Sequence, residues 1–179
     1  MNKLFVFVLV SIFAGSTFAE VESKYVAGPV IQGPYKTTVI ENGSVSFLDT
    51  GDREFPVSMV LDVLGPVGGT KRTLVDKYDV AGSPPKIETV FFYPINGRKS
   101  VVVLVSWTIS SRGIGTYGTL YHVCAYEQGP QGTLVSNEKV QFDDNLHGID
   151  GFQEGEEQKF KYKNAAAIKG YIKKNFNGR

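Results

Sequence analysis

The sequence predicts a β-dominated α+β fold, in which an antiparallel sheet, arranged as a meander or as a sandwich, packs against one C-terminal α-helix. Three observations support this fold class. Short segments with alternating apolar and polar residues dominate the chain, and a period of two is typical of half-buried strands. Asn-Gly and Gly-Pro pairs separate these segments and are typical of tight turns. Helical spacing of apolar residues is found in one segment only, close to the C-terminus.

The first half of the chain contains four predicted strands. Asn42-Gly43 lies between two alternating segments, and an Asn-Gly pair tolerates the positive φ angles that a type I′ hairpin turn needs at both central residues. The pair therefore predicts a hairpin. Glycine and proline residues end the next two segments. The four predicted strands are Lys36–Glu41, Ser44–Asp49, Pro56–Leu64 and Arg72–Val80.

The middle of the chain predicts the core of the fold. Ser100–Ile109 is almost entirely apolar and rich in β-branched residues, which is typical of a central strand covered on both faces. Asn96-Gly97 precedes it and predicts a second tight hairpin turn. Glu88–Ile95 and Thr116–Gln128 flank this strand, and Thr133–Phe142 is expected as a further strand. We expect these segments to form a consecutive antiparallel meander.

One helix is predicted near the C-terminus. Asn164 is a favourable N-cap, and three alanines with strong helix propensity follow it directly. Ala165, Ile168 and Ile172 fall on one face at helical spacing, whereas the lysines lie away from it. The pattern therefore indicates a terminal helix that docks on the sheet and exposes a lysine-rich face.

The first nineteen residues have the pattern of a secretory signal peptide. A lysine precedes the apolar segment Leu4–Phe13, which is too short to span a bilayer because a span needs about 20 residues. Thr17 and Ala19 occupy the −3 and −1 positions of a cleavage site. We expect export to the periplasm with cleavage after Ala19. Residues 1–19 are then the signal peptide, and residues 20–179 form a single β-rich domain with its C-terminal helix.

Charge and cysteine content limit the kinds of partner. The chain carries a formal net charge of +1, and without the leader's lysine 18 basic residues balance 18 acidic ones. Nucleic-acid binding requires a basic field, so nucleic acid is not expected as a partner. We also expect no membrane-spanning segment. Cys124 is the only cysteine, so we expect a buried, inert thiol and no intramolecular disulfide. The oligomeric state is left open.

Catalytic motifs are scarce in this sequence. It contains no G-x-S-x-G, H-E-x-x-H or C-x-x-C motif and no phosphate-binding loop. His122 and Cys124 share one face of a predicted strand, and a thiol beside an imidazole is the minimum for a cysteine nucleophile. We favour a packing role for both, because no orienting carboxylate accompanies them. We therefore expect no enzymatic activity, no cofactor, no catalytic residue and no metal ligand.

The acidic segment Asp143–Glu157 allows two interpretations. Counting Asp143 as position 1, Asn145 falls at position 3, His147 at position 5 and Glu154 at position 12, which is close to the spacing of a calcium loop. An imidazole is a poor calcium ligand, and no helix is predicted before the segment. We therefore prefer a solvated, turn-rich loop that an aromatic residue, Phe152, anchors to the body of the domain.

The segment Ser110–Gly118 is the candidate binding element. It is rich in serine and glycine and joins two rigid strands, so we expect a surface loop with a rigid base and an adaptable tip. Arg112, Ile114 and Tyr117 are the candidate partner-binding residues, because arginine and tyrosine often carry the binding energy of protein interfaces. An ordinary surface loop is the alternative interpretation.

Two stretches of the sequence resemble a known class of protein. FFYPINGRKSVVVLVSW and GFQEGEEQKFKYKNAAAIKGYI, together with the leader, resemble small periplasmic immunity proteins encoded beside bacteriocins or contact-delivered toxins. The resemblance implies a non-catalytic protein that inhibits a toxin or hydrolase of the cell envelope by occluding its active site, and it transfers no functional residue to a numbered position. A periplasmic module that binds a small ligand or calcium is the alternative function.

Overall fold

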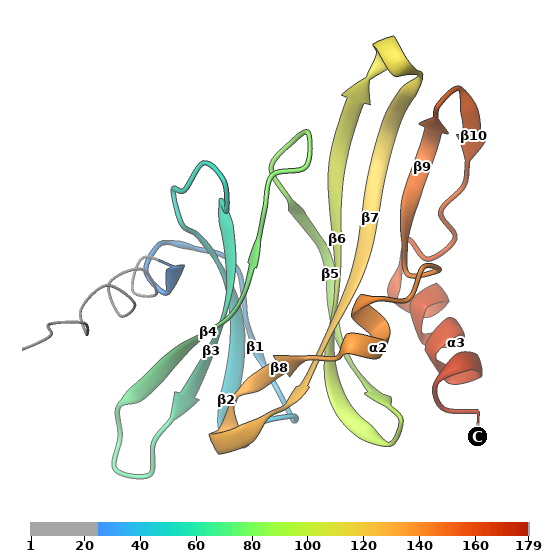
Figure 1. Cartoon of the computed structure of the whole chain (residues 1–179). Helices are drawn as coiled ribbons and strands as arrows, with labels where there is room; N and C mark the ends of the chain where they lie inside the picture. The colour runs from blue at the N-terminus through green and yellow to red at the C-terminus, as the bar shows by residue number, and fades with distance from the viewer. Residues whose placement is uncertain (1–24, 179) are drawn as a thin grey trace, which may run out of the picture.

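The computed structural model describes residues 25–178, so the predicted signal peptide, residues 1–19, lies outside the described residues. Two antiparallel sheets lie face to face, and a helix covers the outer face of the second sheet (Figure 1). The first sheet contains β1 (Val30–Lys36), β2 (Gly43–Asp49), β3 (Val57–Leu64) and β4 (Thr70–Tyr78) in that order. This arrangement confirms the predicted β-dominated antiparallel fold with a C-terminal helix.

The second sheet is the larger one and carries the helix. Its strands are β5 (Lys86–Ile95), β6 (Arg98–Ser111), β7 (Thr116–Gln128), β9 (His147–Gln153) and β10 (Glu156–Gln158), with β8 (Leu134–Ser136) paired to the end of β7. The short helices are η1 (Arg112–Ile114), η2 (Pro130–Gly132) and α2 (Glu138–Gln141), and the long helix is α3 (Ala165–Asn175). The predicted meander of consecutive strands is therefore confirmed for β5, β6 and β7.

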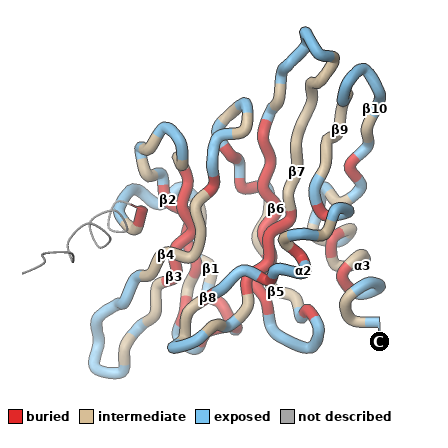
Figure 2. The backbone as a smooth tube through the Cα atoms, viewed as in Figure 1, coloured by how far each residue is buried: buried red, intermediate tan, exposed pale blue. Residues whose placement is uncertain are grey.

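Two apolar cores lie on the two faces of β6. Val101, Val103 and Val105 face the first sheet, whereas Val102 and Leu104 face α3, and all five are fully buried. Figure 2 shows β6 buried along most of its length. The prediction that this strand is central and covered on both faces is therefore confirmed, and its lack of alternation has the expected physical cause.

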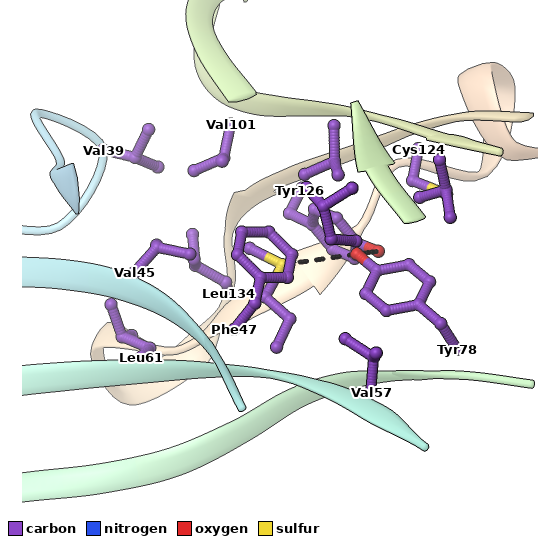
Figure 3. Packing of buried hydrophobic residues seen from close by; sticks show 14 of the residues in the cluster. Val39, Val45, Phe47, Val57, Leu61, Tyr78, Val101, Cys124, Tyr126 and Leu134 are labelled. Atoms are coloured by element: carbon purple, nitrogen blue, oxygen red, sulfur yellow. Dashed lines mark hydrogen bonds between the residues drawn. The ribbon is translucent and has the colours of Figure 1, made fainter. Parts of the chain in front are cut away.

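The core between the sheets also contains polar groups. The hydroxyl groups of Tyr78 and Tyr126 lie 2.9 Å apart, close to Phe47 and Cys124 (Figure 3). Tyr126 also donates a hydrogen bond of 2.6 Å to a carboxylate oxygen of Asp76 on β4. These contacts connect the two sheets through hydrogen bonds as well as through apolar packing.

The C-terminal helix α3 follows its sequence prediction closely. The side chain of Asn164 accepts a hydrogen bond of 2.9 Å from the backbone N–H of Ala167, which is the N-cap contact. Ile168 and Ile172 are fully buried against the second sheet. Within residues 25–178, neither this helix nor any other is long and apolar enough to cross a bilayer.

The N-terminal hairpin differs from its prediction. Of the strand expected at Lys36–Glu41, only Lys36 lies in a strand, and the residues after it form a loop. The strand that pairs with β2 is β1, which ends at Lys36 and lies mostly earlier in the chain. Val39 and Ile40 leave the sheet and fill the core between the sheets, so tertiary burial overrides the local alternation. Asn42 has a φ of 53°, whereas Gly43 does not have a positive φ and already begins β2.

The predicted turn at Asn96-Gly97 is confirmed, whereas the strand predicted after β7 is not. Asn96 and Gly97 have φ values of 51° and 76°, which confirms the tight turn between β5 and β6. The prediction of a strand over Thr133–Phe142 is wrong except for the three residues of β8. The side chain of Asn137 accepts a hydrogen bond from the backbone N–H of Val140 and begins α2 instead, because asparagine favours helix caps over strands.

Candidate functional site

The ends of β6 and β7 form the most prominent surface feature of the described residues. They extend beyond α3 and are joined by η1 at the tip, which is drawn as exposed (Figures 1 and 2). Arg112, Gly113 and Ile114 are exposed, and Ile114 keeps 68% of its surface accessible. The predicted surface position of this loop is confirmed for its first half, whereas Gly115 and the residues that follow to Gly118 are half-buried.

A second hairpin, formed by β9 and β10, lies beside this tip and holds it. The backbone N–H of Gly155 donates a hydrogen bond of 3.0 Å to the carbonyl of Gly115. The N–H of Glu154 donates a hydrogen bond of 3.0 Å to the hydroxyl of Thr116. We call the residues Ser110–Gly118 and Gly151–Gln158 together the head. A second hairpin thus anchors the loop at Gly115 and Thr116, whereas the adaptability expected of its tip, Arg112–Ile114, stays a prediction.

A stack of three side chains runs across the head. The guanidinium carbon of Arg112 lies 5.3 Å from the centre of the Tyr117 ring. That ring stacks on Phe152 of β9, with 5.0 Å between the ring centres and 22° between their planes. Phe152 thus packs on an aromatic ring, but the solvated, turn-rich loop expected around it is wrong, because His147–Gln153 forms strand β9 and pairs with β7. Arg112 has no ion-pair partner within residues 25–178, so its guanidinium is held in place by the ring and stays available.

The head combines charge of both signs with an apolar tip. Glu154, Glu156 and Glu157 are exposed on the second hairpin, and Arg112 and Ile114 are exposed on the first. The structure brings two of the three predicted residues, Arg112 and Tyr117, into contact. The third, Ile114, is exposed and belongs to neither apolar core. Sequence analysis missed the acidic side of the head, since nothing local indicates that residues 40 positions apart are neighbours.

Cys124 and His122 do not form an activated nucleophile. Cys124 lies in the core between the sheets with 3% of its surface exposed, and burial raises the pKa of its thiol to about 12. Reactive cysteines instead have a lowered pKa and an accessible thiolate. Burial also lowers the pKa of His122. The environment of Cys124 fits the packing role that the sequence predicted for it, whereas His122 is half-buried and its Nε2 has no hydrogen-bond partner within residues 25–178.

The calcium-loop spacing of the sequence does not produce a calcium loop. Asp143 bonds instead to its neighbour Asn145 and to the hydroxyl of Tyr171 on α3. The extended strand β9 separates Asp143 from Glu154, and a strand of seven residues spans about 20 Å. Within residues 25–178, no group of three or more His, Cys, Asp or Glu side chains converges on a common point suited to a metal ion.

A cavity of about 600 Å³ opens at the opposite end of the sandwich. It lies between the turn that joins β3 to β4 and the η2 segment. Its apolar wall includes Ile40 and Val63, and its polar groups include Thr70, Lys71 and Thr133. This volume is within the usual range for small-molecule sites. No sequence motif indicated it.

Comparison of the chain with protein-family models, with curated protein sequences and with solved structures found no match. The resemblance to periplasmic immunity proteins therefore stays a prediction.

Proposed function

We propose that this chain is an exported periplasmic binding protein, an inhibitor or immunity protein that neutralises a cell-envelope-targeting toxin or hydrolase by occluding its active site. The observation that carries the proposal is the head, in which an exposed loop is hydrogen-bonded at Gly115 and Thr116 to a neighbouring hairpin. Arg112, Ile114 and Tyr117 are the residues that we assign to the partner interface.

Preorganisation is the first physical argument for this function. Ordering a flexible loop on binding costs about 0.5–1.5 kcal/mol for each immobilised side chain. The stack of Arg112 on Tyr117 and of Tyr117 on Phe152 and the two hydrogen bonds from the second hairpin reduce that cost before any partner arrives. A rigid projecting element of this kind suits insertion into a cleft.

Chemical complementarity is the second argument. Enzymes that cleave glycosidic bonds commonly use a pair of carboxylates in a cleft. The guanidinium of Arg112 is planar and matches a carboxylate with two parallel hydrogen bonds. Ile114 would add apolar contact beside it, and the half-buried Tyr117–Phe152 stack would support the two residues from below. An interface of about 800 Å² per partner is usual for stable complexes.

A mutational binding experiment tests the assignment of the head. The partner is first captured from periplasmic extract with the mature chain, and its dissociation constant is measured by calorimetry. We expect the double variant Arg112→Ala/Tyr117→Ala to weaken binding by at least ~2 kcal/mol, the usual scale of an interface hot spot, which is about thirtyfold in the dissociation constant.

A control pair of comparable chemistry lies far from the head. Phe142 keeps 76% of its surface exposed at the end of α2, and the exposed Lys139 lies three residues before it. The variant Lys139→Ala/Phe142→Ala should bind the partner as the wild type does. Equal affinity of the head variant and the wild type would place the interface elsewhere, and the absence of any captured protein would contradict the inhibitor function itself.

A second candidate function is favoured by the cavity at the opposite end of the sandwich. Its volume of about 600 Å³ and its mixture of apolar and hydroxyl-bearing residues suit a small amphipathic ligand. Native mass spectrometry of the protein isolated from the periplasm is the direct measurement. A bound small molecule that the variant Val63→Trp loses would favour this function, and a protein free of any bound molecule would remove it.

A further inference from the structure

The chain contains only two histidines, and the fold brings them together. The pairing of β7 with β9 places His122 directly opposite His147. Residues opposite each other in antiparallel strands point to the same face of the sheet. Their ring centres are 5.9 Å apart, with an angle of 73° between the ring planes.

This separation matches two imidazoles that share one metal ion. Zinc binds imidazole nitrogen at about 2.0–2.1 Å, which places two rings on a common ion with their centres roughly 5 to 6.5 Å apart. The two rings meet edge to face and are not stacked. His147 is exposed, so an ion has a path from solvent.

Two buried polar atoms at the histidine pair have no hydrogen-bond partner among the described residues. Within residues 25–178, the buried side-chain atoms without a hydrogen-bond partner are Nε2 of His122 and Oε1 of Gln141. The two residues are neighbours, because His122 also interacts with the backbone of Gln141. Buried polar atoms are nearly always satisfied, and an exception calls for an explanation such as an ion.

The surrounding charge favours a cation. The carboxylates of Asp76 and Asp79 act electrostatically on His122, and Asp143 and His147 act on each other in the same way.

We propose that His122 and His147 form a binding site for a divalent transition-metal ion of the zinc, nickel or copper class. Imidazole ligands suit these ions, whereas calcium and magnesium prefer oxygen ligands. With two protein imidazoles, the remaining coordination positions are left to water or to a ligand supplied by another molecule. The site does not include the head, so it stands independently of the function proposed above.

Calorimetric titration of the mature, untagged chain with zinc chloride tests the site. We expect saturable binding of one ion per chain and no heat from calcium chloride. His147→Ala should weaken zinc binding by at least about tenfold, and this variant should fold because the side chain is exposed. Glu154→Gln is the matched control, since it removes a carboxylate from the same acidic segment, and it should bind zinc as the wild type does.

A second measurement needs no substitution. Copper(II) added at low stoichiometry should selectively broaden the imidazole NMR signals of both His122 and His147 in the wild-type chain. The proposal is overturned if zinc shows no saturable binding, if His147→Ala binds zinc as tightly as the wild type, or if the copper effect is spread over the acidic residues and spares the imidazoles.

Discussion

At the scale of single residues, environment decides what each polar side chain does. Cys124 lies between the sheets with 3% of its surface exposed, and burial raises the pKa of its thiol to about 12. Burial likewise raises the pKa values of Tyr78 and Tyr126 well above their ordinary range. By contrast, Arg112 is exposed on the head, where a ring contact holds it. The fold therefore keeps the Cys124 thiol protonated and inaccessible, whereas it leaves the Arg112 guanidinium exposed to solvent.

The buried thiol predicts a specific dependence of stability on pH. The folded state keeps Cys124 protonated up to about pH 12, whereas the unfolded chain ionises near the ordinary value of 9.0. Its contribution is fully present below pH 9 and is lost as the pH rises toward 12, at up to about 1.4 kcal/mol per pH unit. Urea unfolding of wild type and Cys124→Ala between pH 7 and pH 10.5 measures this dependence.

We expect the two free-energy curves to run parallel below pH 9 and to converge above it, because the variant lacks the thiol term. Both proteins keep the tyrosines, so any slope from Tyr78 and Tyr126 is common to the two curves. Curves that stay parallel above pH 9 would show that the thiol is not protected in the way the burial indicates.

At the scale of elements, close backbone contact between β7 and β9 builds the head. Gly118 and Gly151 lie opposite each other with φ values of 136° and 150°. A Cβ atom on Gly118 would lie 2.4 Å from the carbonyl oxygen of Asp150, which is far inside a normal contact. Glycine is required at this position, because both the positive φ and the space exclude a side chain.

Gly118→Ala should therefore loosen the pairing of β7 with β9. We expect a loss of about 1–3 kcal/mol of stability, together with faster amide hydrogen exchange along β9. Gly113→Ala is the matched control in the same loop, because an added Cβ there meets nothing within 4 Å. Equal stability of the two variants would contradict the close approach of these strands.

At the scale of the whole molecule, the two sheets and α3 form three layers with an apolar core between each pair of layers. A series of hydrogen bonds crosses the core between the two sheets. Tyr126 connects the second sheet to Asp76 and Tyr78 on the first. The outer core seats Ile168 and Ile172 of α3 on the second sheet. The sandwich is thus held by apolar burial, and the polar chain selects the relative position of the two sheets.

Removing one hydroxyl tests this connection. Tyr126→Phe removes the hydrogen bond to Asp76 and the contact with the Tyr78 hydroxyl, which within residues 25–178 keeps only its 3.6 Å hydrogen bond to Sδ of Met59. An incompletely satisfied buried group costs about 1–3 kcal/mol. Tyr93→Phe is the control, because no hydrogen bond of the Tyr93 hydroxyl is found within residues 25–178, and its stability should be close to wild type. A double-mutant cycle with Tyr78→Phe should show coupling of about 0.5–3 kcal/mol, and strict additivity would contradict the chain.

The sequence by itself determined the elements whose stability is local. The apolar run of β6, the turn at Asn96-Gly97 and the cap of α3 at Asn164 follow from propensity and spacing, and the structure confirms them. The exposure of Arg112 and Ile114 followed from a polar, glycine-rich loop in the same way. Their function as a binding surface stays a prediction, as does export by the leader.

Only the tertiary structure decided which distant residues meet. It buries Val39 and Ile40 in the inner core, where the local alternation indicated a strand. It seats Phe152 on Tyr117 across the β7–β9 pair. It also joins His122 to His147, two residues that the sequence presented in separate and unpromising motifs. The last two outcomes depend on pairing between strand residues that are 25 or more positions apart. The register of such pairing is set by burial over the whole sheet, which no short stretch of sequence contains.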